Sequence, residues 1–255
     1  MLLLYAMKRG MGWALGVLLL LSVSVYVIYF GEGITGNVVS LDRGMVGHLK
    51  FEGNFNDEVS GNINTGIGDS GFVEGVNGQA VDLDGDDDYI KLDSSPDMFK
   101  FGTGSFTASV WINVDALGVD SEWGSGILRS TRDDDIGDVV LGITNDGRIS
   151  YLHWRNKGPD SNGRHLTGKE IISTGKWHHI VVMWDQSEDR VYLDGNEIDT
   201  DSSTTSYDWG YVKEIGRLSE PSGSNLDGKL DEVKTWRRAL SEEEIKAEFS
   251  RNSPK

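Results

Sequence analysis

Glu197, Asp199 and Asp201 alternate with uncharged residues in the segment 197–201. Side chains two residues apart on a strand share one face, so a strand here would place these carboxylates together. A retaining glycosidase needs two carboxyl groups about 5–5.5 Å apart, and Glu197 with Asp201 could supply them. Acidic residues are frequent in this chain, however, and the segment also suits an acidic surface strand. Glycoside hydrolysis by Glu197 and Asp201 is therefore the alternative hypothesis.

Aromatic side chains suggest a second kind of chemistry, the stacking of sugar rings on tryptophan and tyrosine. We expect several such rings to face outward, with polar loop side chains holding the sugar hydroxyl groups. The candidates for ligand binding are Trp111, Trp123, Tyr151, Trp154, Tyr192 and Trp209. The other interpretation is that these rings pack beneath loops.

Several reactive groups are missing from the sequence. The chain has no cysteine, which excludes disulfides, thiolate zinc sites and a cysteine nucleophile. His178 and His179 are adjacent, so on a strand they point to opposite faces and cannot bind one ion together. The chain contains neither a Gly-x-Ser-x-Gly motif nor a phosphate loop ending in Gly-Lys-Ser/Thr. We therefore predict a binding protein and not an enzyme.

The composition is globular and strongly acidic. Lys and Arg number 24 against 41 Asp and Glu, which gives a formal net charge of −17. Such a surface repels phosphates, so we predict no nucleic-acid partner, whereas divalent cations suit it. Hydrophobic residues make up 38% of the chain, including eight each of Trp, Tyr and Phe, which is enough for a packed core.

The elements that would position these groups are strands, and the central one spans residues 176–185. Its alternating positions are apolar on both faces. Such a strand belongs in the middle of a sheet, with a core on one side and a cover or a ligand on the other. A return strand over 190–198, with a turn at Asp194-Gly195, would complete a hairpin.

Further short strands with Gly, Asp and Asn turns lie on both sides of this hairpin. They span residues 48–52, 80–83, 89–92, 106–114, 127–130, 139–143, 149–154, 211–215 and 229–236. The pattern predicts an all-β fold, a two-sheet antiparallel sandwich. One short C-terminal helix follows, because Ser241 and Glu244 form a capping box flanked by the staple residues Leu240 and Ile245.

Residues 11–30 contain no charged side chain. As a helix this stretch would be about 30 Å long, the thickness of a bilayer's hydrocarbon core. Lys8 and Arg9 precede it and Glu32 follows, so the positive-inside rule places the N-terminus in the cytoplasm. We therefore predict a single-pass protein of the cell membrane. Secretion after signal cleavage, or pilin-like processing after Gly10 in a structural surface component, are the alternatives.

This topology divides the chain into segments. They are a cytoplasmic N-terminus over 1–10, a transmembrane helix over 11–30, a linker over 31–45, an extracellular domain over 46–250 and a tail over 251–255.

Taken in order, the segments of the domain resemble the laminin-G-like domains of the concanavalin A-like jelly-roll family. The matching pieces are residues 47–53, 81–85, 88–90, 104–111, 176–179, 191–195, 228–233 and 238–241. The resemblance implies two stacked antiparallel sheets, one of them concave, and binding of glycans or proteins more often than catalysis. Segment 197–201 is also close to the Glu-x-Asp-x-Glu signature of the glucanases that share this fold, with Asp201 in place of the final glutamate.

The resemblance further implies a structural calcium ion that joins the first strand, the loop near the first glycine turn and the last strand. The matching positions are Glu52, Asp84, Gly85 and Asp231. Calcium prefers several oxygen ligands, which carboxylates and backbone carbonyls provide. The alternative is that Asp84 makes an Asx turn, Asp231 pairs with a base and Glu52 is solvated. We thus expect a membrane-anchored module that binds glycans or cell-surface proteins and carries calcium.

Overall fold

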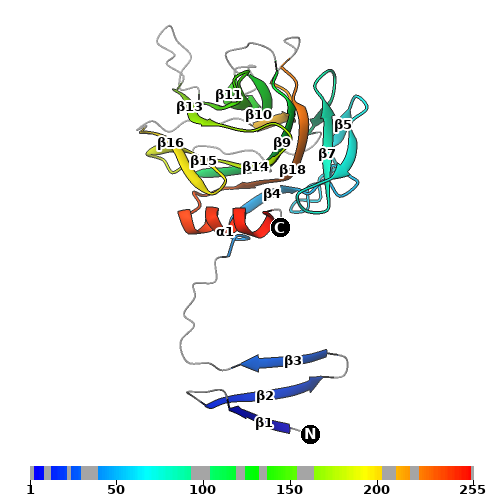
Figure 1. Ribbon diagram of the computed structural model, residues 1–255, viewed down its shortest axis with the longest axis vertical. Helices are drawn as coiled ribbons and strands as arrows, with labels where there is room; N and C mark the ends of the chain where they lie inside the picture. Colours follow the sequence, from blue (N-terminus) through cyan, green and yellow to red (C-terminus); the bar gives the residue numbers. More distant parts are fainter. Residues whose placement is uncertain are drawn as a thin grey trace. The chain divides into compact units, whose positions relative to one another are not determined.

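The computed structural model of the chain divides into two units, Met1–Val38 and Val39–Lys255. The residues that it describes are 3–8, 13–21, 24–29, 40–92, 104–118, 124–131, 137–153, 164–202, 211–218 and 224–253. Strands dominate both units, and a single helix is described near the C-terminus (Figure 1).

The first unit is a small antiparallel sheet and not the predicted helix. Strands β1 (Leu3–Lys8), β2 (Trp13–Leu21) and β3 (Ser24–Tyr29) pair in the order β1-β2-β3. Periodicity cannot separate helix from strand in a continuous apolar run, and the valines, isoleucine and tyrosines of 24–29 favour strands. No helix in the described part of the chain has both the length and the apolar character needed to span a bilayer. The structure therefore does not support a transmembrane helix over 11–30.

The second unit is the predicted antiparallel sandwich. Among the described residues, one sheet has seven strands and the other eight. The first sheet runs β13 (Arg164–Ile171), β12 (Arg148–His153), β11 (Gly137–Ile143), β10 (Ser125–Thr131), β17 (Tyr211–Ile215), β8 (Tyr89–Lys91), β5 (Thr65–Ile67). The second runs β16 (Asn196–Ser202), β15 (Glu188–Leu193), β14 (Trp177–Trp184), β9 (Phe106–Ala116), β18 (Asp227–Trp236), β7 (Gln79–Asp84), β6 (Gly71–Glu74), and β4 (Met45–Leu49) also pairs with β18.

Strand β14 shows how the core is built. Ile180, Val182 and Trp184 point inward and join the main hydrophobic cluster between the two sheets. Val181 and Met183 point to the outer face of the eight-stranded sheet and belong to a second cluster. Both predicted apolar faces are thus confirmed, and each one is covered.

Helix α1 (Glu242–Asn252) packs on this outer face (Figure 1). Its predicted capping box is present, with Ser241 as N-cap and Glu244 at the third helical position. Leu240 and Ile245, the predicted staple, are both buried in the outer cluster together with Trp236. The sequence signals for this helix are therefore confirmed.

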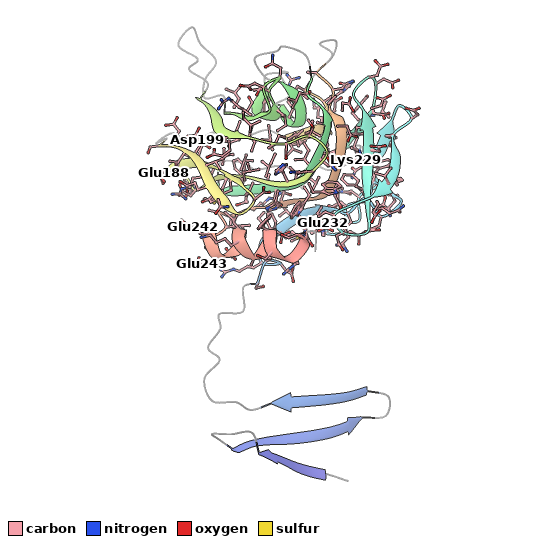
Figure 2. The ribbon with its side chains drawn as sticks, in the orientation of Figure 1. Glu188, Asp199, Lys229, Glu232, Glu242 and Glu243 are labelled. Atoms are coloured by element: carbon pink, nitrogen blue, oxygen red, sulfur yellow. The ribbon has the colours of Figure 1, made fainter. Side chains whose placement is uncertain are left out.

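A group of buried charges lies where α1 meets the sheet. Lys234 is 2% exposed and forms ion pairs with Glu232 and Glu248, each at 2.5 Å. Glu232, which Figure 2 labels near α1, also contacts His48 Nε2 at 3.0 Å. Burial acts to raise the pKa of Glu232, but the His48 hydrogen bond and the charge of Lys234 outweigh it and lower that pKa to about 2. The carboxylate is therefore ionised and paired.

We expect Lys234→Met to destabilise the fold by about 3–5 kcal/mol, because two buried carboxylates lose their cation. Lys246→Met is the matched control on α1, since Lys246 pairs with Glu242 at the surface and should change stability by no more than about 0.5 kcal/mol. Urea unfolding of the two variants measures both values. A loss below about 1 kcal/mol for Lys234→Met would contradict the importance of this cluster.

Candidate functional site

A pocket of about 270 Å³ opens at one end of the eight-stranded sheet, where strands β7 and β9 end and strand β18 begins. We call it the acidic pocket, and it is lined by Asp84, Gly85, Ala116, Leu117, Gly118, Asn225 and Asp227. Strand pairing creates it, because Asp227 at the start of β18 lies opposite Asp84 on one side and Ala116 on the other. Residues more than a hundred positions apart in the sequence thus form one wall.

Turn chemistry fixes the wall at Asp84. Asp84 Oδ1 accepts a hydrogen bond from the backbone N–H of Asp86 at 2.9 Å, which confirms the Asx turn. Gly85 has a φ of +79°, and a Cβ atom there would lie 2.8 Å from Asp227 Cβ. Only glycine therefore suits this close approach. Asn225 donates its side-chain N–H to the carbonyl of Asp86, which ties the start of β18 to the same turn.

The pocket is electrostatically negative. Burial raises the pKa of Asp227, and the negative charges of Asp115 and Asp84 act in the same direction. Lys229, labelled in Figure 2, forms ion pairs with Asp115 and, at 3.6 Å, with Asp82. Carboxylates in such a cleft accept hydrogen bonds from hydroxyl groups and attract cations, and they repel anions.

The predicted calcium ligands do not form one site. Glu52 and Asp231 both contact the turn 75–79, at the start of β7, whereas Asp84 and Gly85 lie at the end of that strand. Asp231 is adjacent to Leu230, which pairs with Val81, so the strand itself separates the two halves of the predicted set. The structure places Glu52 and Asp231 against the same turn and leaves Asp84 with the acidic pocket.

Asp231 is a buried carboxylate without a cation beside it in the described part of the chain. Its side chain is fully buried and accepts hydrogen bonds from the backbone N–H groups of Asn77, at 3.0 Å, and Glu232, at 2.7 Å. Burial raises the pKa of Asp231 to about 7, against the effect of these N–H groups. A carboxylate in this state fits a cation ligand, because a bound ion would supply the missing positive charge.

The turn 75–79 brings further oxygen atoms to the same place. A Cβ at Gly75 would lie 2.5 Å from Asp231 Oδ2 and 2.8 Å from the Gln79 carbonyl oxygen. Glu52 accepts from the backbone N–H of Gln79 at 3.3 Å, and a Cβ at Gly78 would overlap its carboxylate. Two carboxylates and a carbonyl beside one tight turn match the oxygen donors that calcium prefers.

Backbone strain flanks both of these carboxylates. Phe51, just before Glu52, has a φ of 56°, and Glu232, just after Asp231, has a φ of 49°. Left-handed conformations at such residues cost about 1–3 kcal/mol each and cluster at ligand sites. The donor set therefore fits the ion that the sequence resemblance implied.

Three of the predicted sugar-stacking rings lie in the described part of the chain, and all three are buried. Trp111 is 1% exposed and stacks on Phe249 of α1 with ring centroids 5.6 Å apart. Tyr151 lies in the main core and donates its hydroxyl to Asp189, and Tyr192 packs in the outer cluster beneath α1. The outward direction of Trp111 is right, but the helix covers it. Trp123, Trp154 and Trp209 lie outside the described residues.

A β-bulge removes the predicted carboxylate pair of the hydrolase hypothesis. Val191 pairs with Asp199, but the next residue, Tyr192, pairs with Glu197, so one residue of β16 is inserted. Val191 lies in the core and Tyr192 in the outer cluster, and the Tyr192 hydroxyl donates to Glu197 Oε2 at 3.3 Å. Glu197 therefore lies on the opposite sheet face from Asp199, labelled in Figure 2, and from Asp201. The shared face expected for 197–201 is wrong.

With this geometry in place, comparison with known families is informative. A family model described as the concanavalin A-like lectin/glucanases superfamily matches residues 84–246. The chain belongs to this superfamily. No curated protein sequence matches it.

Solved structures show the same concanavalin A-like fold at low sequence identity. The binding domain of Paraclostridial Mosquitocidal Protein 1 is 20% identical with a TM-score of 0.65, over 82% of this chain and 52% of that one. Domain 4 of AbnA, an extracellular arabinanase of Geobacillus stearothermophilus solved with arabinotriose, is 16% identical with a TM-score of 0.61, over 80% and 97%. A botulinum neurotoxin type C structure is 14% identical with a TM-score of 0.62, over 83% and 52%. The chain thus spans about half the length of the toxin chains.

Sequence reasoning missed Asn225, Asp227 and Leu117 as pocket residues. Asp227 precedes Gly228 in the same Asp-Gly pattern as Asp84-Gly85, but in the structure these two residues begin strand β18 and form no turn. That the turn after β7 meets the start of β18 depends on the pairing of these two strands. Pairing between such distant strands cannot be read from a single sequence.

Proposed function

We propose that this concanavalin A-like chain is a glycan-binding module whose ligand occupies the acidic pocket. The lining of the pocket carries the proposal. Asp84 and Asp227 provide carboxylate acceptors on one wall, and Leu117 provides an apolar contact for a sugar ring. The solved arabinanase domain with arabinotriose, and the neurotoxin that enters cells through interaction with two ganglioside molecules, support glycan binding for this fold.

The charge of the pocket favours uncharged sugars. Each carboxylate can accept hydrogen bonds from two neighbouring hydroxyl groups, and such charge-assisted bonds are the strong ones. One N–H of Asn225 is held by the Asp86 carbonyl, which leaves its second N–H and its carbonyl oxygen for a ligand. Sialylated or sulfated glycans would be repelled by Asp84 and Asp227. We therefore propose neutral glycans as the ligand class, in preference to a cell-surface protein.

Asp227→Asn should weaken glycan binding by roughly ten- to a hundredfold. This substitution keeps the shape of the side chain but removes a charged hydrogen bond, which contributes about 1.5–3 kcal/mol. A glycan array with the full-length protein identifies the ligand, and calorimetry with that ligand measures both affinities. Asp86→Asn is the control and should bind normally, because Asp86 lies in the turn after β7 but outside the pocket lining. Unchanged binding by Asp227→Asn, or binding to sialylated glycans alone, would contradict the proposal.

We propose in addition that Glu52 and Asp231 hold a structural calcium ion with the carbonyl oxygen of Gln79. The burial of Asp231, its raised pKa and the glycine turn beside it support this assignment. The bound ion would supply positive charge next to Asp231. The site would join two parts of the sheet, because the 75–79 turn connects β6 to β7 and Asp231 belongs to β18.

Calcium should raise the melting temperature, because it binds the folded state; the gain is about 2.7 kcal/mol at a hundred times Kd. Asp231→Asn should reduce this gain. Without calcium the variant should be at least as stable as the wild type, since it removes a buried charge. Glu74→Gln, exposed at the end of β6, is the matched control. Differential scanning calorimetry with calcium or chelator measures each shift, and an equal calcium response in Asp231→Asn and wild type would disprove this site.

We also propose that residues 11–30 attach the module to the cell membrane, with the domain outside. Support comes from twenty uncharged residues behind Lys8 and Arg9, and not from the strands found there. After expression in bacteria, the full chain should stay with the membrane pellet through an alkaline carbonate wash. A chain that begins at residue 40 should not. Release of the full chain by the wash would contradict attachment.

A further inference from the structure

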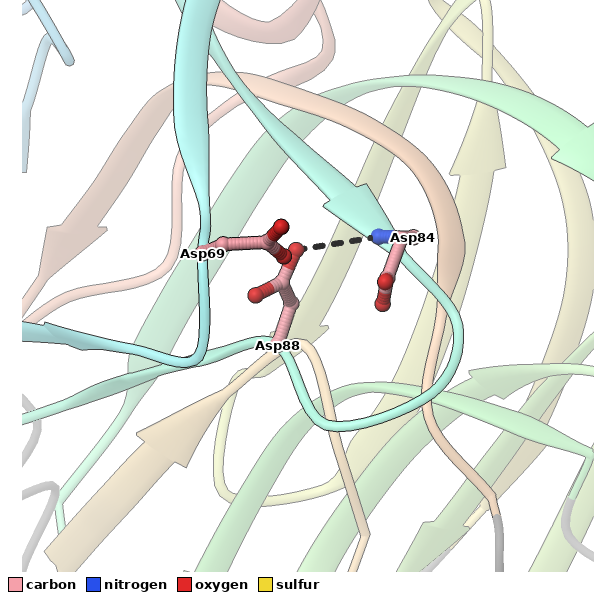
Figure 3. Close-up of side chains that lie close together, drawn as sticks. All are labelled: Asp69, Asp84 and Asp88. Atoms are coloured by element: carbon pink, nitrogen blue, oxygen red, sulfur yellow. Dashed lines mark hydrogen bonds between the residues drawn. The ribbon is translucent and has the colours of Figure 1, made fainter.

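We propose that Asp69, Asp84 and Asp88 form a second calcium-binding site, between the β5–β6 turn and the β7–β8 turn (Figure 3). One carboxylate oxygen from each residue lies within 4.8 Å of the others. Two oxygen ligands on opposite sides of a calcium ion, each at about 2.4 Å, are about 4.8 Å apart. Three oxygens this close together can surround one ion after small shifts of the side chains.

Asp88 is the residue that distinguishes this cluster from an ordinary group of surface acids. Its side chain is 2% exposed. Asp88 Oδ2 accepts a hydrogen bond from the backbone N–H of Asp84 at 3.2 Å, but Oδ1 has no partner at good hydrogen-bond geometry within the described parts of the chain. Buried carboxylate oxygens are almost always satisfied, and an unsatisfied one is costly. Figure 3 shows the Asp69 and Asp88 carboxylates turned toward each other. A cation between them would therefore be the fitting partner.

In the part of the chain that the structure describes, no positive side chain balances the cluster. Among the described residues, none of the three aspartates forms an ion pair with lysine or arginine, and the nearby Lys229 is already paired with Asp82 and Asp115. Burial raises the pKa of Asp88, and the negative charges of Asp84 and Asp69 add to this, while the backbone N–H groups of the same two residues oppose it. A divalent cation would reverse the repulsion, as hard cations do when carboxylates converge.

The backbone is shaped to bring the two turns this close. Gly68 has a φ of +79°, and a Cβ atom there would overlap Asp88 Oδ1 and lie 3.1 Å from Asp87 Oδ1. Any other residue at 68 would be strained at this φ and would displace either the Asp88 carboxylate or the β5–β6 turn. The Asx turn of Asp84 holds the opposite side. Glycine at 68 therefore suits the close approach of Asp69 to Asp88.

This site is separate from the one at Asp231. Asp84 ends β7, whereas Asp231 follows the residue that pairs with Val81 near the strand's start. Four residues of extended chain correspond to roughly 13 Å. The inference rests only on the three aspartates and does not depend on glycan binding. Since Asp84 also lines the acidic pocket, however, an ion here would hold one wall of that pocket in place.

Calcium binding to the full-length Asp231→Asn variant tests the inference, because that background removes the other proposed ion. Equilibrium dialysis with radioactive calcium should find one bound calcium per chain. Adding Asp88→Asn should weaken this binding at least about tenfold, because one opposite charge within a few ångströms of the ion is lost. Asp69→Asn should have the same effect, and since Asp69 is exposed this variant keeps the test valid should Asp88→Asn fail to fold.

Asp86→Asn is the matched control, an exposed aspartate in the same turn that is not part of the cluster. It should change the calcium affinity less than twofold, because a solvated charge that does not contact the ion acts weakly. Absence of bound calcium in Asp231→Asn would overturn the inference. Equal weakening by Asp86→Asn and Asp69→Asn would also overturn it, since general surface charge would then explain the binding.

Discussion

The structure depends on the fact that β14 is apolar on both faces, in the middle of the eight-stranded sheet. One face is buried by the opposing sheet, but the other would be left in water without α1. Burying that face stabilises the fold by about 25 cal/mol for each Å² of apolar surface. The helix therefore belongs to the core of the domain. Its cap at Ser241 and its staple at Leu240 and Ile245 fix where it begins against Trp236.

Because the opposing sheet covers one face of β14 and α1 covers the other, neither face is open to a ligand there. Trp111 and Tyr192 pack beneath the helix, and Tyr151 lies between the sheets, so these three rings are used in packing and present no open face. Polar groups that cannot enter a core gather instead at the strand ends. There the turns of β7 and the start of β18 meet, and Asp84 and Asp227 face the same pocket. The proposed binding at the strand ends is consistent with how completely the faces of the sheet are filled.

Local signals in the sequence predicted local structure well. The alternation of β14, the capping box and the Asp194-Gly195 turn, with φ values of 50° and 77°, are all confirmed. The bulge that moves Glu197 to the other face could not be predicted, because one inserted residue shifts every later side chain and leaves no mark in composition. The calcium ligands taken from the family likewise mixed the two ends of β7. Periodicity reports which residues alternate, but partner strands decide which residues meet.

Asp84 takes part in both proposed sites at this end of the sheet, the acidic pocket and the cluster with Asp69 and Asp88. Coulomb repulsion between Asp84, Asp88 and Asp227 opposes the close approach of their turns, and Lys229 is committed to Asp82 and Asp115. A cation beside Asp84 would lower this repulsion and would leave Asp227 as the proposed hydroxyl acceptor of the pocket. If the two ligands bind on opposite sides of Asp84, each must change the affinity for the other by the same factor. A single shared carboxylate would then couple the proposed metal binding to the proposed sugar binding, without any movement of the sandwich beneath it.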